Sequence, residues 1–182
     1  MTKLITLLLA VNLLTLEASA AWEPDKKNRD PQTGASKKTM IALEKFREIP
    51  ELEAYFEEAD GYAVFANIAK GGIGIGGAGG KGEVFQNGKA IGATSLKQFS
   101  IGFQLGGQAF SEIIFFKGKR DTNRFTEGNF EFGAQASAVL IKQGVAVETA
   151  YSNGVAVFTI AKGGLMYEAS IAGQKFSFEG YD

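Results

Sequence analysis

The sequence predicts an α+β fold that is mainly β, with one or two N-terminal helices before an antiparallel barrel-like or sandwich sheet of about eight or more strands. Apolar residues recur at helical spacing between Ser36 and Asp60, whereas beyond Gly61 they alternate with polar ones. The chain also has 24 glycines and 15 phenylalanines, a pairing that suits twisted, curved sheets better than helical bundles.

Two helices are expected before the sheet. Ser36 can cap the first helix, whose inner face carries Met40, Leu43 and Phe46. Pro50 ends that helix, and because proline is tolerated in a first turn, a second short helix is expected to run from there to Glu58. Basic residues dominate the first helix and acidic residues the second, a pattern that solvated helix faces explain in part.

The rest of the chain has the pattern of a strand meander. The stretches "SIGFQLGGQAF" and "FEFGAQASA" alternate apolar and polar residues, as strands with one wet face do. Asn87-Gly88 and Asn153-Gly154 stand between strand-like runs and can adopt the positive φ angles of a two-residue hairpin. Only "GKRDTNRFTEGN" breaks the pattern, and one or two helical turns are expected within it, at Asp121 to Thr126.

One short sequence motif, called the repeated phrase below, occurs twice in nearly the same form. "AVFANIAKGG", from Ala63 to Gly72, returns as "AVFTIAKGG", from Ala156 to Gly164. Each copy is expected to be a strand that leaves the core and bends at its two glycines, so the copies mark corresponding corners of a closed sheet. The segment between them shows no further self-similarity, which argues against a solenoid or propeller.

The N-terminus has the features of an export signal over residues 1–20. Lys3 supplies the positive end, Leu4 to Leu16 an apolar stretch, and Ala18-Ser19-Ala20 a small-residue cleavage site. Residues 21–35 are polar and predict a flexible tether, and residues 36–182 a single domain, helical over 36–60 and β-rich over 61–182. The protein is therefore expected to be exported, most plausibly to a bacterial periplasm.

Composition excludes several classes of function. The chain has no cysteine and no histidine, which excludes disulfides, Cys/His zinc sites and histidine-based triads. A formal net charge of −1 gives no global field to recruit nucleic acid. The acidic cluster from Glu51 to Asp60 is best explained as a solvated helix face, and no serine lies in a nucleophile elbow. We therefore expect no cofactor, metal or catalysis, with a Ser-Lys or paired-carboxylate hydrolase as the minor alternative.

"GIGGAG", from Gly74 to Gly79, formally matches the dinucleotide fingerprint. That fingerprint needs a helix to begin in the motif, and here the β-like Glu83-Val84-Phe85 follows instead. The glycines then indicate either close packing of another element or a ligand that approaches the backbone, and close packing is favoured.

Basic residues gather in two further places. Lys70, Lys81 and Lys162 flank the glycine bends, where exposed amides beside a lysine can hold an anionic head group. A second basic patch follows the apolar run from Ile113 to Phe116 and consists of Lys117, Lys119, Arg120 and Arg124. An apolar run beside a basic loop suits a membrane surface, although a buried strand followed by a hairpin loop has the same pattern.

Four blocks resemble the SYLF domain family in its exported bacterial branch: "VFANIAKGGIGIGGAGGKG", "SIGFQLGGQAFSEIIFF", "NFEFGAQASA" and "YSNGVAVFTIAKGGLMYEASIAGQKF". The resemblance covers Ser36 to Phe178, with alanine at position 66 where the family often has proline. It implies a lipid-binding module, because eukaryotic relatives bind phosphoinositides with the help of an amphipathic N-terminal helix and fungal ones also engage actin and endocytic machinery. For an exported bacterial protein, an anionic phospholipid takes the place of those ligands.

Together these observations predict a non-catalytic periplasmic lipid-binding module that lies peripherally on a membrane and holds anionic phospholipid. The candidate contacts are the basic helix, with Lys37, Lys38, Lys45 and Arg47, and the glycine bends, with Lys70, Lys81 and Lys162. One alternative is an envelope scaffold or protein-interaction domain without a lipid ligand. Another is a small outer-membrane barrel, which the helical N-terminus and the glycine- and glutamine-rich strand faces argue against.

Overall fold

The computed structural model describes residues 28–73, 75–101, 107–133, 136–141, 151–162 and 171–182. The expected signal peptide lies outside them. Residues 28–35 of the expected tether pack against the domain, where the Thr33 carbonyl accepts a 2.8 Å hydrogen bond from the Ala90 amide and Ala35 is fully buried. The elements, in order, are α1 (Lys37–Arg47), η2 (Pro50–Leu52), α2 (Glu53–Glu58), β1 (Gly61–Ile73), β2 (Ile75–Gln86), β3 (Lys89–Ile101), β4 (Gln108–Phe116), α3 (Lys119–Thr126), β5 (Val139–Leu140), β6 (Val155–Ala161) and β7 (Gln174–Gly180).

The strands form one mixed sheet, mostly antiparallel, which confirms the α+β, mainly β class. Over the described residues it has seven strands in the order β5-β6-β4-β1-β2-β3-β7. β1, β2 and β3 are long consecutive antiparallel strands, and β5 pairs with β6 in parallel. Within the described part of the chain the sheet is open, with β5 and β7 as its outer strands.

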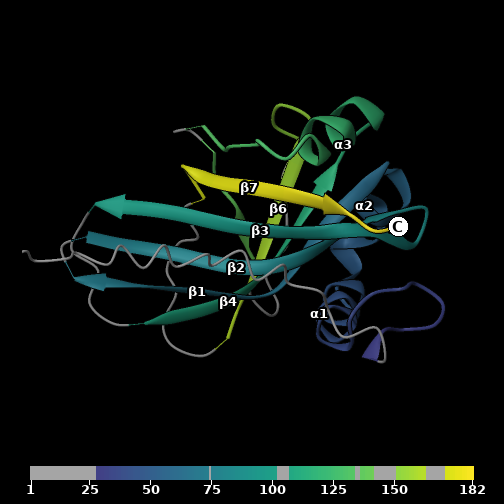
Figure 1. Cartoon of the computed structure of the whole chain (residues 1–182), viewed down its shortest axis with the longest axis horizontal. Helices are drawn as coiled ribbons and strands as arrows, with labels where there is room; N and C mark the ends of the chain where they lie inside the picture. The colour runs from purple at the N-terminus through teal and green to yellow at the C-terminus, as the bar shows by residue number, and fades with distance from the viewer. Residues whose placement is uncertain (1–27, 74, 102–106, 134–135, 142–150, 163–170) are drawn as a thin grey trace, which may run out of the picture.

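This open sheet is strongly curled. β4 and β7 are separated by three strands in the sheet order, yet the Gln174 side chain of β7 reaches Glu112 of β4. The rings of Phe65 and Phe176 likewise meet across the curl, with centroids 5.7 Å apart. Figure 1 shows the result, with β6 passing behind β3. The expected barrel-like shape is thus approached by curling.

The two faces of the sheet carry separate apolar cores. We call the face packed by α1, η2 and α2 the helix face; its cluster includes Leu43, Phe46, Phe85, Phe115 and Phe158. The inner face, enclosed by the curl, is packed by α3 and by residues 130–132 and 136–138; its cluster includes Phe65, Ile114, Phe116, Phe125 and Phe176. Because strand side chains alternate between faces, neighbours such as Phe115 and Phe116 serve different cores.

One stretch of chain touches both edges of the sheet. At the β7 edge, the Phe132 amide donates to the Gln174 carbonyl at 3.0 Å and the Phe176 amide to the Phe130 carbonyl at 2.9 Å. Farther along, β5 pairs with β6 at the opposite edge. We call the described residues 130–133 and 136–141 the crossing segment. "FEFGAQASA" was expected to form a strand; in the described residues it pairs only locally, because it spans the inner face instead of following one neighbour.

The helix caps, helix limits and hairpin turns predicted from the sequence are present in the structure. The Ser36 side chain caps α1 by accepting a hydrogen bond from the Thr39 amide at 3.3 Å. Pro50 begins η2, and α2 continues to Glu58. Asn87-Gly88 and Asn153-Gly154 both have positive φ angles, as the hairpin prediction requires. The expected helical turns at Asp121–Thr126 form α3.

The repeated phrase does not mark two equivalent corners. In β1 the first copy places Phe65 in the inner-face cluster, whereas in β6 the second copy places Phe158 in the helix-face cluster. The first copy is one residue longer, and β1 has a bulge between Phe65 and Asn67 at that point. The expected bend at Gly71-Gly72 is wrong, because both glycines continue β1 in register with β2. The bend expected at residues 163–164 lies outside the described residues.

The glycine-rich stretch lies in a β-hairpin, as the absence of a following helix predicted. Two glycines beside the β1 bulge explain part of its composition. A Cβ at Gly82 would lie 2.5 Å from the Val64 carbonyl oxygen, and one at Gly80 would lie 2.8 Å from that of Asn67. At these two positions the close-packing interpretation holds.

Candidate functional site

α1 is fixed on the helix face by its buried side and by its first turn. Leu43 and Phe46 are almost completely buried against the sheet. The buried Glu83 carboxylate accepts a 2.9 Å hydrogen bond from the Ser36 amide and a 2.7 Å hydrogen bond from the Tyr181 hydroxyl. A carboxylate at this position also stabilises the positive end of the helix dipole. The outward side of α1 is therefore held in a defined orientation.

The predicted cationic residues of α1 divide into two groups. Lys37, Lys38 and Lys45 are exposed. Helical spacing places Lys38 and Lys45, seven residues apart, on one side of α1 beside Ile41, whose side chain is 57% exposed. Arg47 lies on the other flank, where its guanidinium stands 4.9 Å from the Phe56 ring centroid and donates to the Tyr62 hydroxyl at 3.3 Å. Arg47 therefore has a packing role that the sequence did not predict.

Lys162 joins the cationic side of α1. It follows β6, where its amide donates to the Ala109 carbonyl at 2.8 Å, and alternation from Ile160 directs it to the helix face. Desolvation by neighbouring groups, and then the charge of Lys45, lower the pKa of the Lys162 ammonium. The structure thus brings together Lys45 and Lys162, which are far apart in sequence.

Lys81 also lies on the helix face, and two residues that the sequence did not single out accompany it. By alternation from Phe85, Lys81 points to the helix face, and so do Lys97 and Phe99, because the intervening Leu96 and Gln98 are buried on the inner face. Phe99 is 83% exposed. Its partner in β2 is Gly77, which has no side chain to cover it.

These residues belong to a continuous exposed part of the helix face. The cluster under the described helices reaches only to Ala66 in β1. Beyond that point the exposed residues described in β1, β2 and β3 are small or polar, apart from one aromatic ring, and include two lysines; Lys175 of β7, which is paired with Glu131, lies beside Lys97. We call this part of the face the strand surface; its exposed members are Asn67, Ala69, Gly71, Gly79, Lys81, Lys97 and Phe99.

Lys70 lies on the opposite face from the other lysines. It pairs in register with Ala78, which belongs to the inner-face cluster, and alternation from Ile68 gives the same orientation. Lys70 and Lys162 occupy equivalent places in the repeated phrase but lie on opposite faces of the sheet, because the two copies present opposite faces.

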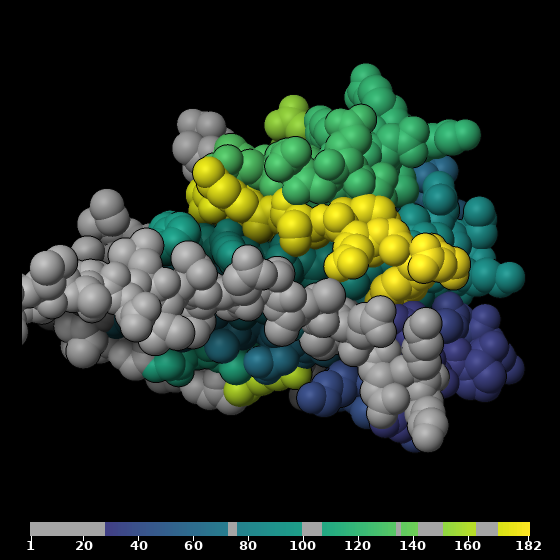
Figure 2. Space-filling view, in the orientation of Figure 1, coloured from purple at the N-terminus to yellow at the C-terminus, as the bar shows by residue number. Residues whose placement is uncertain are grey.

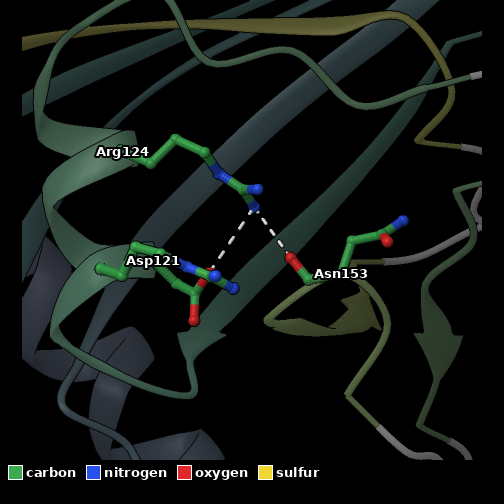
Figure 3. Close-up of polar contacts among 4 residues, drawn as sticks. Asp121, Arg124 and Asn153 are labelled. Atoms are coloured by element: carbon green, nitrogen blue, oxygen red, sulfur yellow. Dashed lines mark hydrogen bonds and ion pairs between the residues drawn. The ribbon is translucent and has the colours of Figure 1, made fainter.

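Among the described residues, the second basic patch does not lie beside an exposed apolar segment that could enter a membrane. The apolar run from Ile113 to Phe116 is fully buried, so it is an ordinary core strand. Arg124 is tied to the neighbouring hairpin: its Nη2 donates to the Asn153 carbonyl at 2.8 Å and lies 4.0 Å from Asp121 Oδ1 (Figure 3). Arg120 approaches the same carboxylate at 3.7 Å but is almost wholly exposed.

Arg124 also lines a cavity of about 530 Å³ between the crossing segment and β6. The floor consists of buried apolar residues, and the exposed residues around it come from α3 and the residues after it, from the crossing segment and from the β6 hairpin. The principal lining residues are Arg124, Phe132, Asn153, Val155, Val157 and Ile171. In Figure 2 the α3 region, in green, and α1, in purple, lie on opposite sides of β7, in yellow. The cavity and the basic side of α1 are therefore separate regions.

The described residues contain neither a metal site of acidic side chains nor a membrane-spanning helix. No group of acidic side chains there is arranged to hold a metal ion. No helix in that part of the chain has the length and apolar character needed to cross a membrane.

Comparison with known proteins gives one informative similarity. The chain is 29% identical over 133 residues to Beta cell expansion factor A from Aeromonas veronii, a match that covers 72% of this chain and 50% of that protein. The two proteins are thus distant homologues, and this chain spans about half the length of its relative. No family model matches the chain.

Proposed function

We propose that this protein is an exported, non-catalytic lipid-binding module that attaches peripherally to anionic phospholipid through its helix face. The contact surface combines the exposed side of α1 with Lys162 and the strand surface. The observation that carries the proposal is Phe99, an aromatic ring 83% exposed on the same sheet face as Lys81 and Lys97. An exposed ring among lysines matches the chemistry of a membrane interface, where aromatic rings enter the head-group layer and ammonium groups pair with phosphates.

Electrostatics supports the same surface. The formal net charge of the chain is −1, so attraction to anionic lipid must come from a local concentration of cations. Lys45 and Lys162 are close enough to interact, and basic residues near an anionic membrane contribute about 1 kcal/mol each. The lowered pKa of Lys162 also has a consequence here, since a neighbouring phosphate would favour the charged form and offset the repulsion from Lys45.

The resemblance to the SYLF domain points to the same chemistry, with α1 in the place of the lipid-contacting helix. The export signal expected over residues 1–20 puts the protein in contact with bacterial envelope lipids, in the periplasm. Of the seven basic residues predicted from the sequence, we assign lipid contact to Lys37, Lys38, Lys45, Lys81 and Lys162. Arg47 and Lys70 are left out because of their placement.

Vesicle flotation tests the proposal directly. Protein expressed from its full coding sequence is expected to float with phosphatidylglycerol-containing vesicles at low salt and to be released near 1 M salt, where the Debye length falls to about 3 Å. The double variant K81Q/K97Q is expected to float poorly. Its matched control, K119Q/R120Q, removes two charges beside the inner face and is expected to float like the parent.

Two outcomes would overturn this assignment. If the parent protein does not float with anionic vesicles at low salt, the lipid proposal is wrong, and stable capture of an envelope protein would then favour the alternative of a scaffold without a lipid ligand. If both double variants lose binding equally, attraction is diffuse and the helix face is not the contact surface.

A further inference from the structure

The cavity beside Arg124 is built differently from the proposed membrane surface. The apolar side chains at its floor, Phe132, Val155, Val157 and Ile171, belong to the inner-face core and are each less than a tenth exposed. Its exposed rim is polar and includes Arg124, Ser152 and Asn153. A volume of about 530 Å³ lies within the usual range for small-molecule sites.

The guanidinium of Arg124 is already oriented at this rim. Both of its polar contacts, to the Asn153 carbonyl and to Asp121, are made by Nη2, which leaves Nη1 and Nε outside those contacts. The ring of Phe130 lies 5.1 Å from the guanidinium carbon and supports it from one side. A guanidinium group that is held in place in this way can bind a carboxylate or phosphate with little further loss of side-chain conformational freedom.

Arg124 is the only basic residue among the lining residues that the structure describes, and it belongs to a basic stretch of chain. The stretch from Lys117 to Arg124 has four basic residues and one acidic residue, Asp121, which Arg120 and Arg124 share. Two carboxylates line the rim as well. Glu131 is paired with Lys175 at 3.3 Å, and Glu127 is exposed to solvent, where its charge is screened.

Ordered water is a poor occupant for the floor of this cavity. A buried water needs two to four polar partners, and the floor side chains are hydrocarbon. A ligand with one anionic end and one apolar end satisfies both parts of the site. We propose that the cavity binds a single-chain anionic amphiphile, such as a fatty-acid anion, with its head group on Arg124 and its chain over Val155, Val157 and Ile171.

Titration calorimetry with laurate below its micelle concentration tests this inference. One-to-one binding is expected, with affinity reduced about tenfold or more in R124Q, because hydrogen bonds to charged groups are strong. R120Q is the matched control: Arg120 is in the same helix and approaches the same Asp121, but does not line the cavity. Dodecanol, which has the same chain without the charge, is expected to bind more weakly than laurate and to be insensitive to R124Q.

A variant that blocks the space provides a second measurement. Ser137 is an exposed residue of the rim, so S137W is expected to keep the melting temperature of the parent and to lose laurate binding. Absence of laurate binding to the parent, equal affinities for R124Q and R120Q, or unchanged affinity in a folded S137W would each overturn the proposal. R124Q should still float with anionic vesicles, so failure of this site and failure of the proposed membrane function are distinguishable.

Discussion

Gln174 Nε2, at the start of β7, donates a 3.3 Å hydrogen bond to Glu112 Oε2 in β4, across the packed interior of the curled sheet. Both residues are fully buried. Burial raises the pKa of Glu112 to about 8, and the hydrogen bond from Gln174 opposes this rise only in part. Glu112 is therefore mostly a neutral acid at pH 7, inside a core of mainly aliphatic and aromatic side chains.

This burial makes the stability of the protein pH-dependent. The folded-state pKa exceeds the value of 4.5 for an exposed glutamate, so the folded chain holds the proton more tightly than the unfolded chain. The contribution of Glu112 is fully present below pH 4.5 and is lost as the pH rises toward about 8, with a slope of at most about 1.4 kcal/mol per pH unit. Urea unfolding of parent and E112Q between pH 5 and pH 8 measures this, and E112Q is expected to remove the slope. Equal slopes would show that Glu112 does not titrate in this range.

Substitution at Gly82 is expected to destabilise the fold. A Cβ there would lie 2.5 Å from the Val64 carbonyl oxygen and 2.8 Å from Phe65 Cδ1, so G82A must shift β1 near its bulge. The expected cost is about 1–3 kcal/mol in the free energy of unfolding. G79A is the control in the same strand, since its Cβ would lie 3.6 Å from the nearest atom, the Leu96 carbonyl oxygen. Similar denaturation midpoints for the two variants would contradict the close-approach argument.

Loss of the α1 cap is expected to loosen the basic helix. S36A removes the acceptor for the Thr39 amide and should cost about 1 kcal/mol in the free energy of unfolding. S36N restores a capping side chain and should recover most of that loss. Chemical denaturation compares the three proteins. If S36A is as stable as the parent, the cap does not anchor α1.

The exposed aromatic ring allows a direct test of the membrane surface. F99S is expected to leave the melting temperature nearly unchanged, because Phe99 is 83% exposed, and to weaken binding to anionic vesicles. I41S makes the corresponding change on α1, where the side chain is 57% exposed. A loss of vesicle binding in I41S but not in F99S would restrict the contact to the helix. A large fall in the melting temperature of F99S would instead assign the ring a structural role.

The sequence was sufficient wherever one short segment determines the conformation. Ser36, Pro50 and the two Asn-Gly pairs act through their own backbone, so the caps, helix limits and hairpins were predictable. The candidate surface was only partly predictable, because the face to which a strand residue points depends on its partners. Lys70 and Lys162 have nearly the same surrounding sequence, yet their side chains point to opposite faces of the sheet.

The aromatic ring and the cavity show what long-range packing adds. Phe99 is exposed because its cross-strand neighbour is Gly77 and because the helix-face cluster reaches only to Ala66 in β1. The cavity lies beside residues that pair with β7 at 130–132 and with β6 at 139–140, an arrangement that alternation within "FEFGAQASA" does not reveal. Arg124 gains its place at the rim through a hairpin some thirty residues later, where Asn153 holds it.

The crossing segment pairs with β7 at one end and contains β5 at the other, so it occupies hydrogen-bonding positions on two strands that are far apart in the sheet order. Detaching the crossing segment would leave unpaired strand edges on both sides of the sheet. Unpaired strand edges are templates for pairing with other chains. This stretch therefore covers strand edges that would otherwise be available to other chains, and a variant without it is expected to self-associate.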